Sequence, residues 1–195
     1  MTIAFVLGNG TSRRDIDLRQ LRTHGAVYGC NALYRDFEPT VLVSTDPPIS
    51  AEIQNSGYSQ QHCHYTRKPL PESGAQRIPP RYFGFSSGPA AAGIATQDRH
   101  RKIYLLGFDL GPTTMGTFNN VYADTEFYKK STATPTYSGN WVRQLVSIMT
   151  DNPRTTYTRV IGEGTANIAE FAHLDNHYSL ALADFLDRIN NGKDL

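Results

Sequence analysis

The sequence lacks a long hydrophobic run and a secretory leader. No stretch reaches the roughly 18 continuous apolar residues of a transmembrane helix, and the first residues have neither the basic flank nor the cleavage site of a signal peptide. These absences exclude the membrane-spanning and secreted classes at the level of sequence. We therefore expect a cytoplasmic protein with no membrane span.

An excess of one charge and a cysteine framework are also missing. The 19 lysines and arginines balance 18 acidic residues, for a formal net charge of +1, so no general attraction to nucleic acid or to a membrane surface is expected. The only cysteines, Cys30 and Cys63, are predicted to be free thiols. In His62-Cys63-His64, alternate residues of a strand point to opposite faces and no fourth ligand is placed, so we predict no metal site.

What the chain does contain is a regular alternation of short apolar runs and helix-like intervals, the pattern of a parallel sheet covered by helices. The predicted strands are 3–7, 26–30, 40–45, 63–66, 81–85, 102–108 and 158–162. The predicted helices are 13–21, 49–54, 89–97, 140–149, 166–174 and 178–189. With 195 residues, 39% of them hydrophobic, we predict one domain, 1–195, with an α/β, Rossmann-like fold: a mostly parallel sheet with helices on both faces.

Two stretches depart from this alternation. Residues 68–80 contain four prolines and are predicted to form an irregular surface connection. Residues 111–139 are poor in periodic apolar residues and rich in Thr, Tyr and Asn. Long irregular segments in compact domains commonly act as lids or binding loops, so we predict a lid insertion at about 111–139.

Small and amide-bearing residues follow the predicted strands at the points where they end. The first strand breaks into a Gly-x-Gly turn, which can bring backbone amides close to a phosphate but also serves simply to join a strand to a helix. Because ligands of parallel sheets bind beyond the carboxyl ends of the strands, these positions together predict a nucleotide site. The predicted nucleotide-binding residues are Gly8, Asn9, Gly10, Asn31, Asp46, Ser86, Ser87, Gly88, Asp109, Asn120 and Tyr122.

Two common phosphate motifs are excluded. The first loop has no lysine, so the Walker grip on a triphosphate is absent. The position three beyond Gly10 is Arg13 rather than glycine, which disfavours a nicotinamide dinucleotide.

Four segments resemble the bacterial sialyltransferases of glycosyltransferase family 42, and a wider group of phage and bacterial proteins that open with Gly-Asn-Gly-Pro-Ser. The segments are Gly8-Asn9-Gly10-Thr11-Ser12, Gly29-Cys30-Asn31-Ala32-Leu33-Tyr34, Ser86-Ser87-Gly88, and Lys102-Ile103-Tyr104-Leu105-Leu106-Gly107-Phe108-Asp109. The resemblance covers most of residues 1–150. It implies a Rossmann-like sheet, a cytidine monophosphate sugar as donor, a hydroxyl on a glycan as acceptor, a lid, no required cofactor, and a homo-oligomer.

The resemblance also implies roles for individual residues. The first loop and Asn31 would hold phosphate and ribose, while Ser87 and Gly88 would hold the nucleotide. Tyr122 or a neighbour would contact the phosphate from the lid; Tyr128 and Tyr137 are further candidates, and simple packing within the lid is the alternative.

The chain departs from the family at two important positions. Asp46 stands where the sialyltransferases tend to carry asparagine, and Asn140 stands where they carry a histidine general base. Asparagine cannot accept a proton at neutral pH. His64 and His177 are the remaining candidates for that catalytic role.

Three functions therefore follow from the sequence. The first is a nucleotide-sugar-dependent glycosyltransferase. The second is a non-catalytic protein that binds or sequesters a nucleotide. The third follows from a more distant resemblance to archaeal-type pterin pyrophosphokinases, in which Asp46 and Asp109 would hold Mg²⁺.

Overall fold

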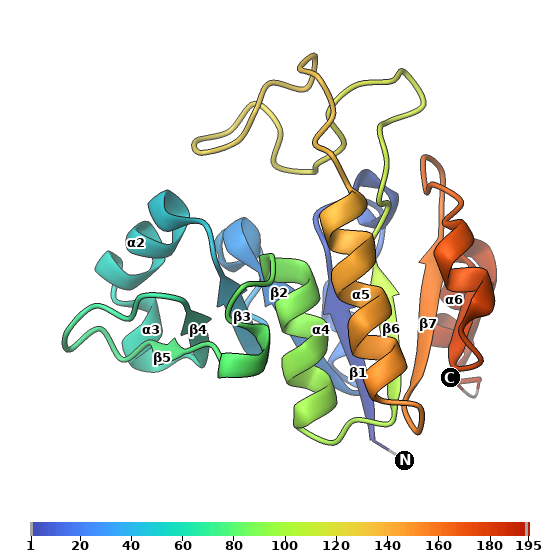
Figure 1. Cartoon of the computed structure of the whole chain (residues 1–195), viewed down its shortest axis with the longest axis horizontal. Helices are drawn as coiled ribbons and strands as arrows, with labels where there is room; N and C mark the ends of the chain where they lie inside the picture. The colour runs from blue at the N-terminus through green and yellow to red at the C-terminus, as the bar shows by residue number, and fades with distance from the viewer. Residues whose placement is uncertain (1, 194) are drawn as a thin grey trace.

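The computed structural model describes residues 2–193 and 195, which form one parallel sheet with helices on both faces (Figure 1). Its strands are β1 Ile3–Leu7, β2 Ala26–Cys30, β3 Val41–Ser44, β4 His64–Thr66, β5 Gln76–Arg77, β6 Lys102–Leu106, β7 Thr156–Ile161 and β8 His177–Ala181. Its α-helices are α1 Leu18–Leu21, α2 Pro47–Asn55, α3 Tyr58–Gln61, α4 Ser87–Gln97, α5 Gly139–Asp151 and α6 Leu182–Asn191. Short 3₁₀ helices are η1 Thr11–Arg13, η2 Asn31–Arg35, η3 Pro80–Tyr82 and η4 Ala169–His173.

The strand order is β5-β4-β3-β2-β1-β6-β7-β8, and every neighbouring pair is parallel. From β1 the chain extends the sheet outward through β5, and then returns to place β6 on the other side of β1. The order therefore reverses between β1 and β6. In open parallel sheets the crevice at such a reversal is where ligands bind.

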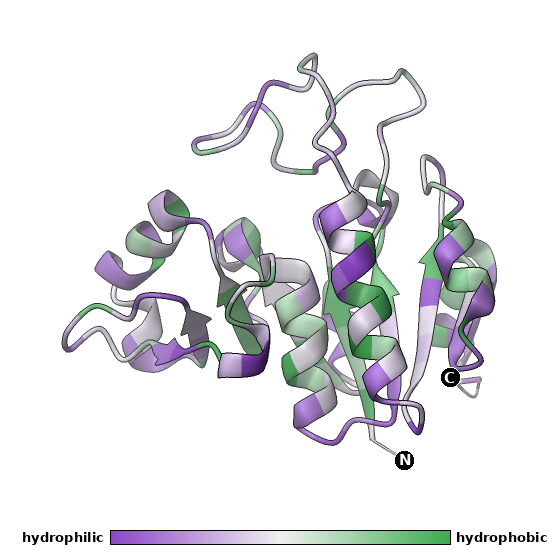
Figure 2. Ribbon diagram, in the orientation of Figure 1, coloured by the Kyte–Doolittle hydropathy of each residue, from purple (hydrophilic) through white to green (hydrophobic). Residues whose placement is uncertain are grey.

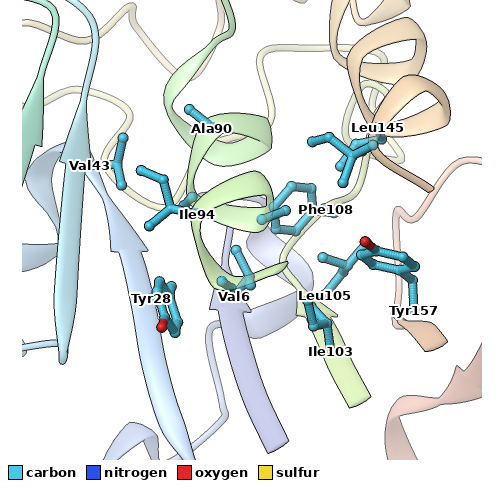
Figure 3. Packing of buried hydrophobic residues seen from close by; sticks show 14 of the residues in the cluster. Val6, Tyr28, Val43, Ala90, Ile94, Ile103, Leu105, Phe108, Leu145 and Tyr157 are labelled. Atoms are coloured by element: carbon cyan, nitrogen blue, oxygen red, sulfur yellow. The ribbon is translucent and has the colours of Figure 1, made fainter. Parts of the chain in front are cut away.

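The alternation of side chains along β1 explains why both faces are covered. Ala4 and Val6 pack with α4 and α5, whereas Phe5 and Leu7 pack on the opposite face with α2 and α6. Figure 3 shows the first of these layers, in which Ile94 and Leu145 lie over the strands. Both faces of a central parallel strand must be apolar, and the central strands are correspondingly hydrophobic in Figure 2.

The predicted fold class is confirmed, but several predicted elements are wrong. Residues 81–85 form no strand: η3 ends at Tyr82, whose ring packs 5.6 Å from that of Phe85, so these aromatics fill the core from a turn. Residues 166–174 contain only η4. In place of the predicted helix 13–21 there are two short helices, η1 and α1. Asp17 is the N-cap of α1 and accepts a hydrogen bond from the Arg19 amide, so α1 begins only at Leu18.

The two outer strands were missed. β5 lies inside the segment predicted to be irregular, and β8 occupies the start of the predicted helix 178–189, which begins only at Leu182. Between β6 and α5, residues 107–138 contain no helix or strand, in agreement with the irregular segment predicted there. We call residues 111–138 the lid segment; it arches over the carboxyl ends of the strands in Figure 1.

No helix in the described ranges combines the length and the hydrophobicity needed to cross a bilayer.

Candidate functional site

A cavity of about 400 Å³ lies at the carboxyl edge of the sheet, where the strand order reverses. It brings together ten of the eleven residues predicted to bind nucleotide. These are Gly8, Asn9, Gly10, Asn31, Asp46, Ser86, Ser87, Gly88, Asp109 and Asn120. Their binding role is a prediction that the structure does not test, but their proximity follows from the parallel topology.

The glycines of the first loop are required by close packing against the loop that follows β6. A Cβ at Gly8 would stand 2.5 Å from the Gly107 carbonyl oxygen, and one at Gly10 would stand 2.4 Å from the Asp109 Cγ. The amides of Gly8 and Gly10 donate to the carbonyls of Leu106 and Gly107, both at 2.8 Å. The expectation that this loop offers its amides to a phosphate is therefore wrong for these two residues, because the neighbouring loop already accepts them.

The next two amides are also satisfied within the protein. Thr11 N–H donates to Asn119 Oδ1 at 2.8 Å, and Ser12 N–H donates to Asp109 Oδ2 at 3.1 Å. In the described part of the chain, the Asn9 amide is the one in this loop without an acceptor. Among the described residues of this first loop, Asn9 is therefore the one whose amide can donate to a ligand.

Asp109 fastens three loops to one another. Its side chain accepts hydrogen bonds from the Ser12 hydroxyl and from Asn119 Nδ2, while its main-chain oxygen accepts from Arg159 Nη2 at 2.9 Å. Arg159 is buried and also donates to the Phe108 carbonyl at 2.8 Å. Burial lowers the pKa of Arg159 to about 10, which leaves the guanidinium charged at neutral pH. The Asp109 carboxylate is accordingly compensated by donors of the protein itself.

Tyr122 is the one predicted residue that does not line the cavity. It is buried, and its hydroxyl lies 3.4 Å from Arg13 Nη2. Burial raises the pKa of Tyr122, so the phenol stays protonated. Tyr122 is part of the lid segment and anchors it to Arg13. A contact between Tyr122 and a phosphate stays a prediction.

The lid segment is held to the first loop at several points. Asn119 accepts from the Thr11 amide, and the Val121 amide donates to the Asn9 carbonyl at 2.8 Å. Further along, Tyr128 Oη accepts from the Ala32 amide at 3.2 Å. Of the other proposed lid tyrosines, Tyr137 is exposed and lies outside the cavity lining.

Asn31 links two sides of the cavity. Its Oδ1 accepts from the Ser87 hydroxyl at 2.8 Å, and its Nδ2 donates to Asp46 Oδ2 at 3.2 Å. Asn31 has φ of 51°, a left-handed conformation that asparagine tolerates better than most residues. Ser87 in turn accepts from the Thr45 amide at 2.9 Å, so this polar network is built largely from strand ends.

The amino terminus of α4 opens onto the same cavity. Ser86 is its N-cap, and its amide donates to Gln144 Oε1 at 2.9 Å. The amides of Ser87 and Gly88 stand in the first turn, where an α-helix supplies no acceptor. These are the donors that the sequence pattern Ser86-Ser87-Gly88 predicts for a ligand.

Tyr128, named from the sequence as a further lid candidate, lines the cavity, but sequence reasoning missed other residues of the lining. The lid segment contributes Lys129 and the aromatic residues Phe118 and Phe127, and α5 contributes Trp141. For the lid residues, the one indication in the sequence was the aromatic content of the predicted lid. Cys30 also lines the cavity, but burial raises its pKa to about 12, which removes it as a nucleophile at neutral pH.

The two histidines proposed for catalysis lie outside this cavity. His64 is fully buried between the hydroxyls of Ser44 and Ser59, at 2.6 and 2.7 Å, and burial lowers its pKa to about 4. His177 packs on Phe171 beside a different cavity, and burial together with the nearby Arg159 charge lowers its pKa to about 4.

Asn140 is exposed at the start of α5, where its Oδ1 accepts from Arg143 at 2.9 Å. It does not line the cavity.

The carboxylates of the cavity do not form a metal centre. Within residues 2–193 and 195, no group of three or more His, Cys, Asp or Glu residues is arranged to hold an ion. Asp109 uses both oxygens to accept from Ser12, and only Asp46 remains as a carboxylate with a free oxygen. Of the two carboxylates predicted to hold Mg²⁺ under the pyrophosphokinase alternative, Asp46 therefore keeps a free oxygen, whereas Asp109 already uses both of its oxygens within the protein.

No family model, no curated protein and no solved structure matches this chain.

Proposed function

We propose that the protein is a nucleotide-sugar-dependent glycosyltransferase of sialyltransferase-like architecture, which binds its donor in the cavity between β1 and β6. The observation that carries the proposal is the gathering of ten sequence-predicted residues around one cavity at the reversal of strand order. A volume of about 400 Å³ suits a nucleotide-sized ligand.

The chemistry proposed is attack of an acceptor hydroxyl on the sugar carbon that carries the phosphate. The carbon–oxygen bond to the phosphate breaks, the nucleotide leaves with the electron pair, and the proton of the acceptor hydroxyl passes to the departing phosphate oxygen. Asn9, Asn120 and Lys129 supply hydrogen-bond donors around the leaving group. The aromatic side of the lid segment would limit access of water, which otherwise competes with the acceptor.

A second candidate is binding of a nucleotide without transfer. It is favoured by one specific observation: no histidine lines the cavity, and Asn140 occupies the position that carries the base in the resembled family. In this case the same residues would recognise the ligand, and the protein would sequester or sense it.

Two measurements test these proposals in turn. Titration calorimetry with cytidine, uridine, guanosine and adenosine monophosphates tests binding; failure of all four to bind would remove both candidates. Incubation with cytidine monophosphate N-acetylneuraminate, uridine diphosphate glucose and a panel of oligosaccharides, followed by chromatography of the released nucleotide, tests transfer. Binding without release of nucleotide would favour the second candidate.

A further inference from the structure

Among the described residues, one cation and two carboxylates line the cavity. They are Lys129, Asp46 and Asp109. Asp109 is buried and interacts electrostatically with the Arg159 guanidinium, whereas Lys129 and Asp46 are exposed, so these two residues present the charge that a ligand meets most directly.

Lys129 offers a positive charge that the protein itself uses little. The residue is exposed, and its ammonium group lies 3.3 Å from Thr136 Oγ1 and 5.7 Å from the ring centroid of Phe118. No carboxylate of the described residues forms an ion pair with it. An anionic group of a ligand is the partner that would complete its interactions.

Asp46 makes its end of the cavity unsuitable for a second anion. It is the N-cap of α2, and Pro47 and Pro48 occupy the first helical positions. Proline has no amide hydrogen, so this helix end lacks two of the amide donors that would otherwise attract an anion. The Asp46 carboxylate is exposed, and Asn31 Nδ2 is its one hydrogen-bond donor in the described chain.

We propose that the cavity selects a donor with its anionic group at Lys129 and an uncharged, hydroxyl-bearing sugar at Asp46. This inference rests on the proposed function and narrows its substrate class: the transferred sugar carries no carboxylate, in contrast to sialic acid. A carboxylated sugar at Asp46 would be repelled, because no cation of the described residues forms an ion pair with that carboxylate, whereas sugar hydroxyls can donate to its free oxygen.

The experiment compares ligands that differ by one carboxylate. Calorimetry is performed with cytidine monophosphate N-acetylneuraminate against its methyl ester, and with uridine diphosphate glucose against uridine diphosphate glucuronate. The proteins are the unmodified chain, Asp46→Asn, and Glu126→Gln as a matched control. Glu126 is an exposed lid carboxylate outside the cavity lining.

We expect the uncharged member of the pair to bind about tenfold more tightly than the carboxylated member. In Asp46→Asn this ratio should fall toward one, while Glu126→Gln should retain it. Equal or tighter binding of the carboxylated ligand by the unmodified chain would overturn the inference, as would a ratio that Asp46→Asn leaves unchanged.

Failure of the proposed function is distinguishable from these outcomes. If none of the four nucleoside monophosphates binds, the nucleotide site is wrong and the inference falls with it. If they bind but the ligand pairs show no preference, only the inference fails.

Discussion

Arg13 Nη2 lies 3.4 Å from the hydroxyl of Tyr122, and the Arg13 guanidinium lies 5.7 Å from the centroid of the Tyr122 ring. Arg13 is buried, has no carboxylate partner among the described residues, and also donates through Nε to the Gly8 carbonyl at 2.6 Å. The same side chain therefore supports the first loop and holds the lid segment.

Replacement of this buried guanidinium should loosen the lid segment. We expect Arg13→Met to destabilise the fold by about 2 kcal/mol, because the Gly8 carbonyl and the Tyr122 hydroxyl lose a charged donor. Faster proteolysis within 111–138 should accompany this loss. Urea denaturation and limited trypsin digestion measure the two effects. Arg14→Met, at an exposed neighbouring residue, is the control. Equal stability and equal proteolysis rates in the two variants would contradict a role for Arg13 in holding the lid segment.

The Asn31 side chain should contribute to ligand affinity. Asn31→Gly is the suitable variant because glycine accepts the φ of 51° without strain. Loss of the hydrogen bonds that the Asn31 side chain forms with Ser87 and Asp46 should weaken nucleotide binding by about 1 to 3 kcal/mol. Arg99→Gly, at another positive φ of 68°, controls for added chain freedom away from the cavity. Unchanged calorimetric affinity would remove Asn31 from the site.

Lys129 should carry an electrostatic part of the affinity. We expect Lys129→Met to weaken binding of a nucleoside monophosphate by about 1 kcal/mol at low ionic strength, and by less as added salt screens the charge. Lys130→Met removes the adjacent lid charge, which lies outside the lining, and should change affinity little. A similar loss in both variants would indicate general attraction rather than a specific contact.

Gly10 should tolerate no side chain. A Cβ there would lie 2.4 Å from Asp109 Cγ and 2.6 Å from the Gly107 carbonyl oxygen, so Gly10→Ala should destabilise the fold by about 3 kcal/mol as the two loops separate. Gly84→Ala provides the control, since a Cβ at Gly84 meets nothing within 4 Å. Thermal denaturation of the two variants should separate them clearly; a Gly10→Ala protein as stable as Gly84→Ala would contradict the packing.

Buried His64 should make stability depend on pH. Its folded pKa of about 4 lies below the ordinary histidine value of 6.5, so the unfolded chain binds a proton first as the pH falls. Stability is therefore greatest above pH 6.5 and declines toward pH 4, by up to about 3 kcal/mol from this group. His177 shifts in the same direction. Urea denaturation between pH 7.5 and 4.5 should show a shallower decline in His64→Gln than in the unmodified chain.

The sequence predicted the inner part of the fold well because buried strands carry a strong signal. β1 and β2 agree with their predicted bounds, and the positions at their carboxyl ends converge on the cavity. The outer strand β8 was predicted as helix because its residues are largely exposed, and the alternation of Tyr178 and Leu180 with polar residues is too short to separate β8 from the helix that follows it.

Contacts between distant loops were beyond the reach of the sequence. Nothing local shows that Asp109 accepts from Ser12, or that Arg13 turns inward to Tyr122. Lys129 was missed for the same reason, since its place in the lining depends on where the irregular segment folds back.

The pairing of β1 with β6 also has a consequence for the order of assembly. Ile3 pairs with Lys102, so one edge of β1 has no partner strand until more than half of the polypeptide has left the ribosome. Until then an apolar strand carries an open row of backbone donors and acceptors, which other nascent chains could pair with. The reversal that creates the crevice thus leaves one edge of the central strand β1 unpaired while β2 to β5 are already synthesised.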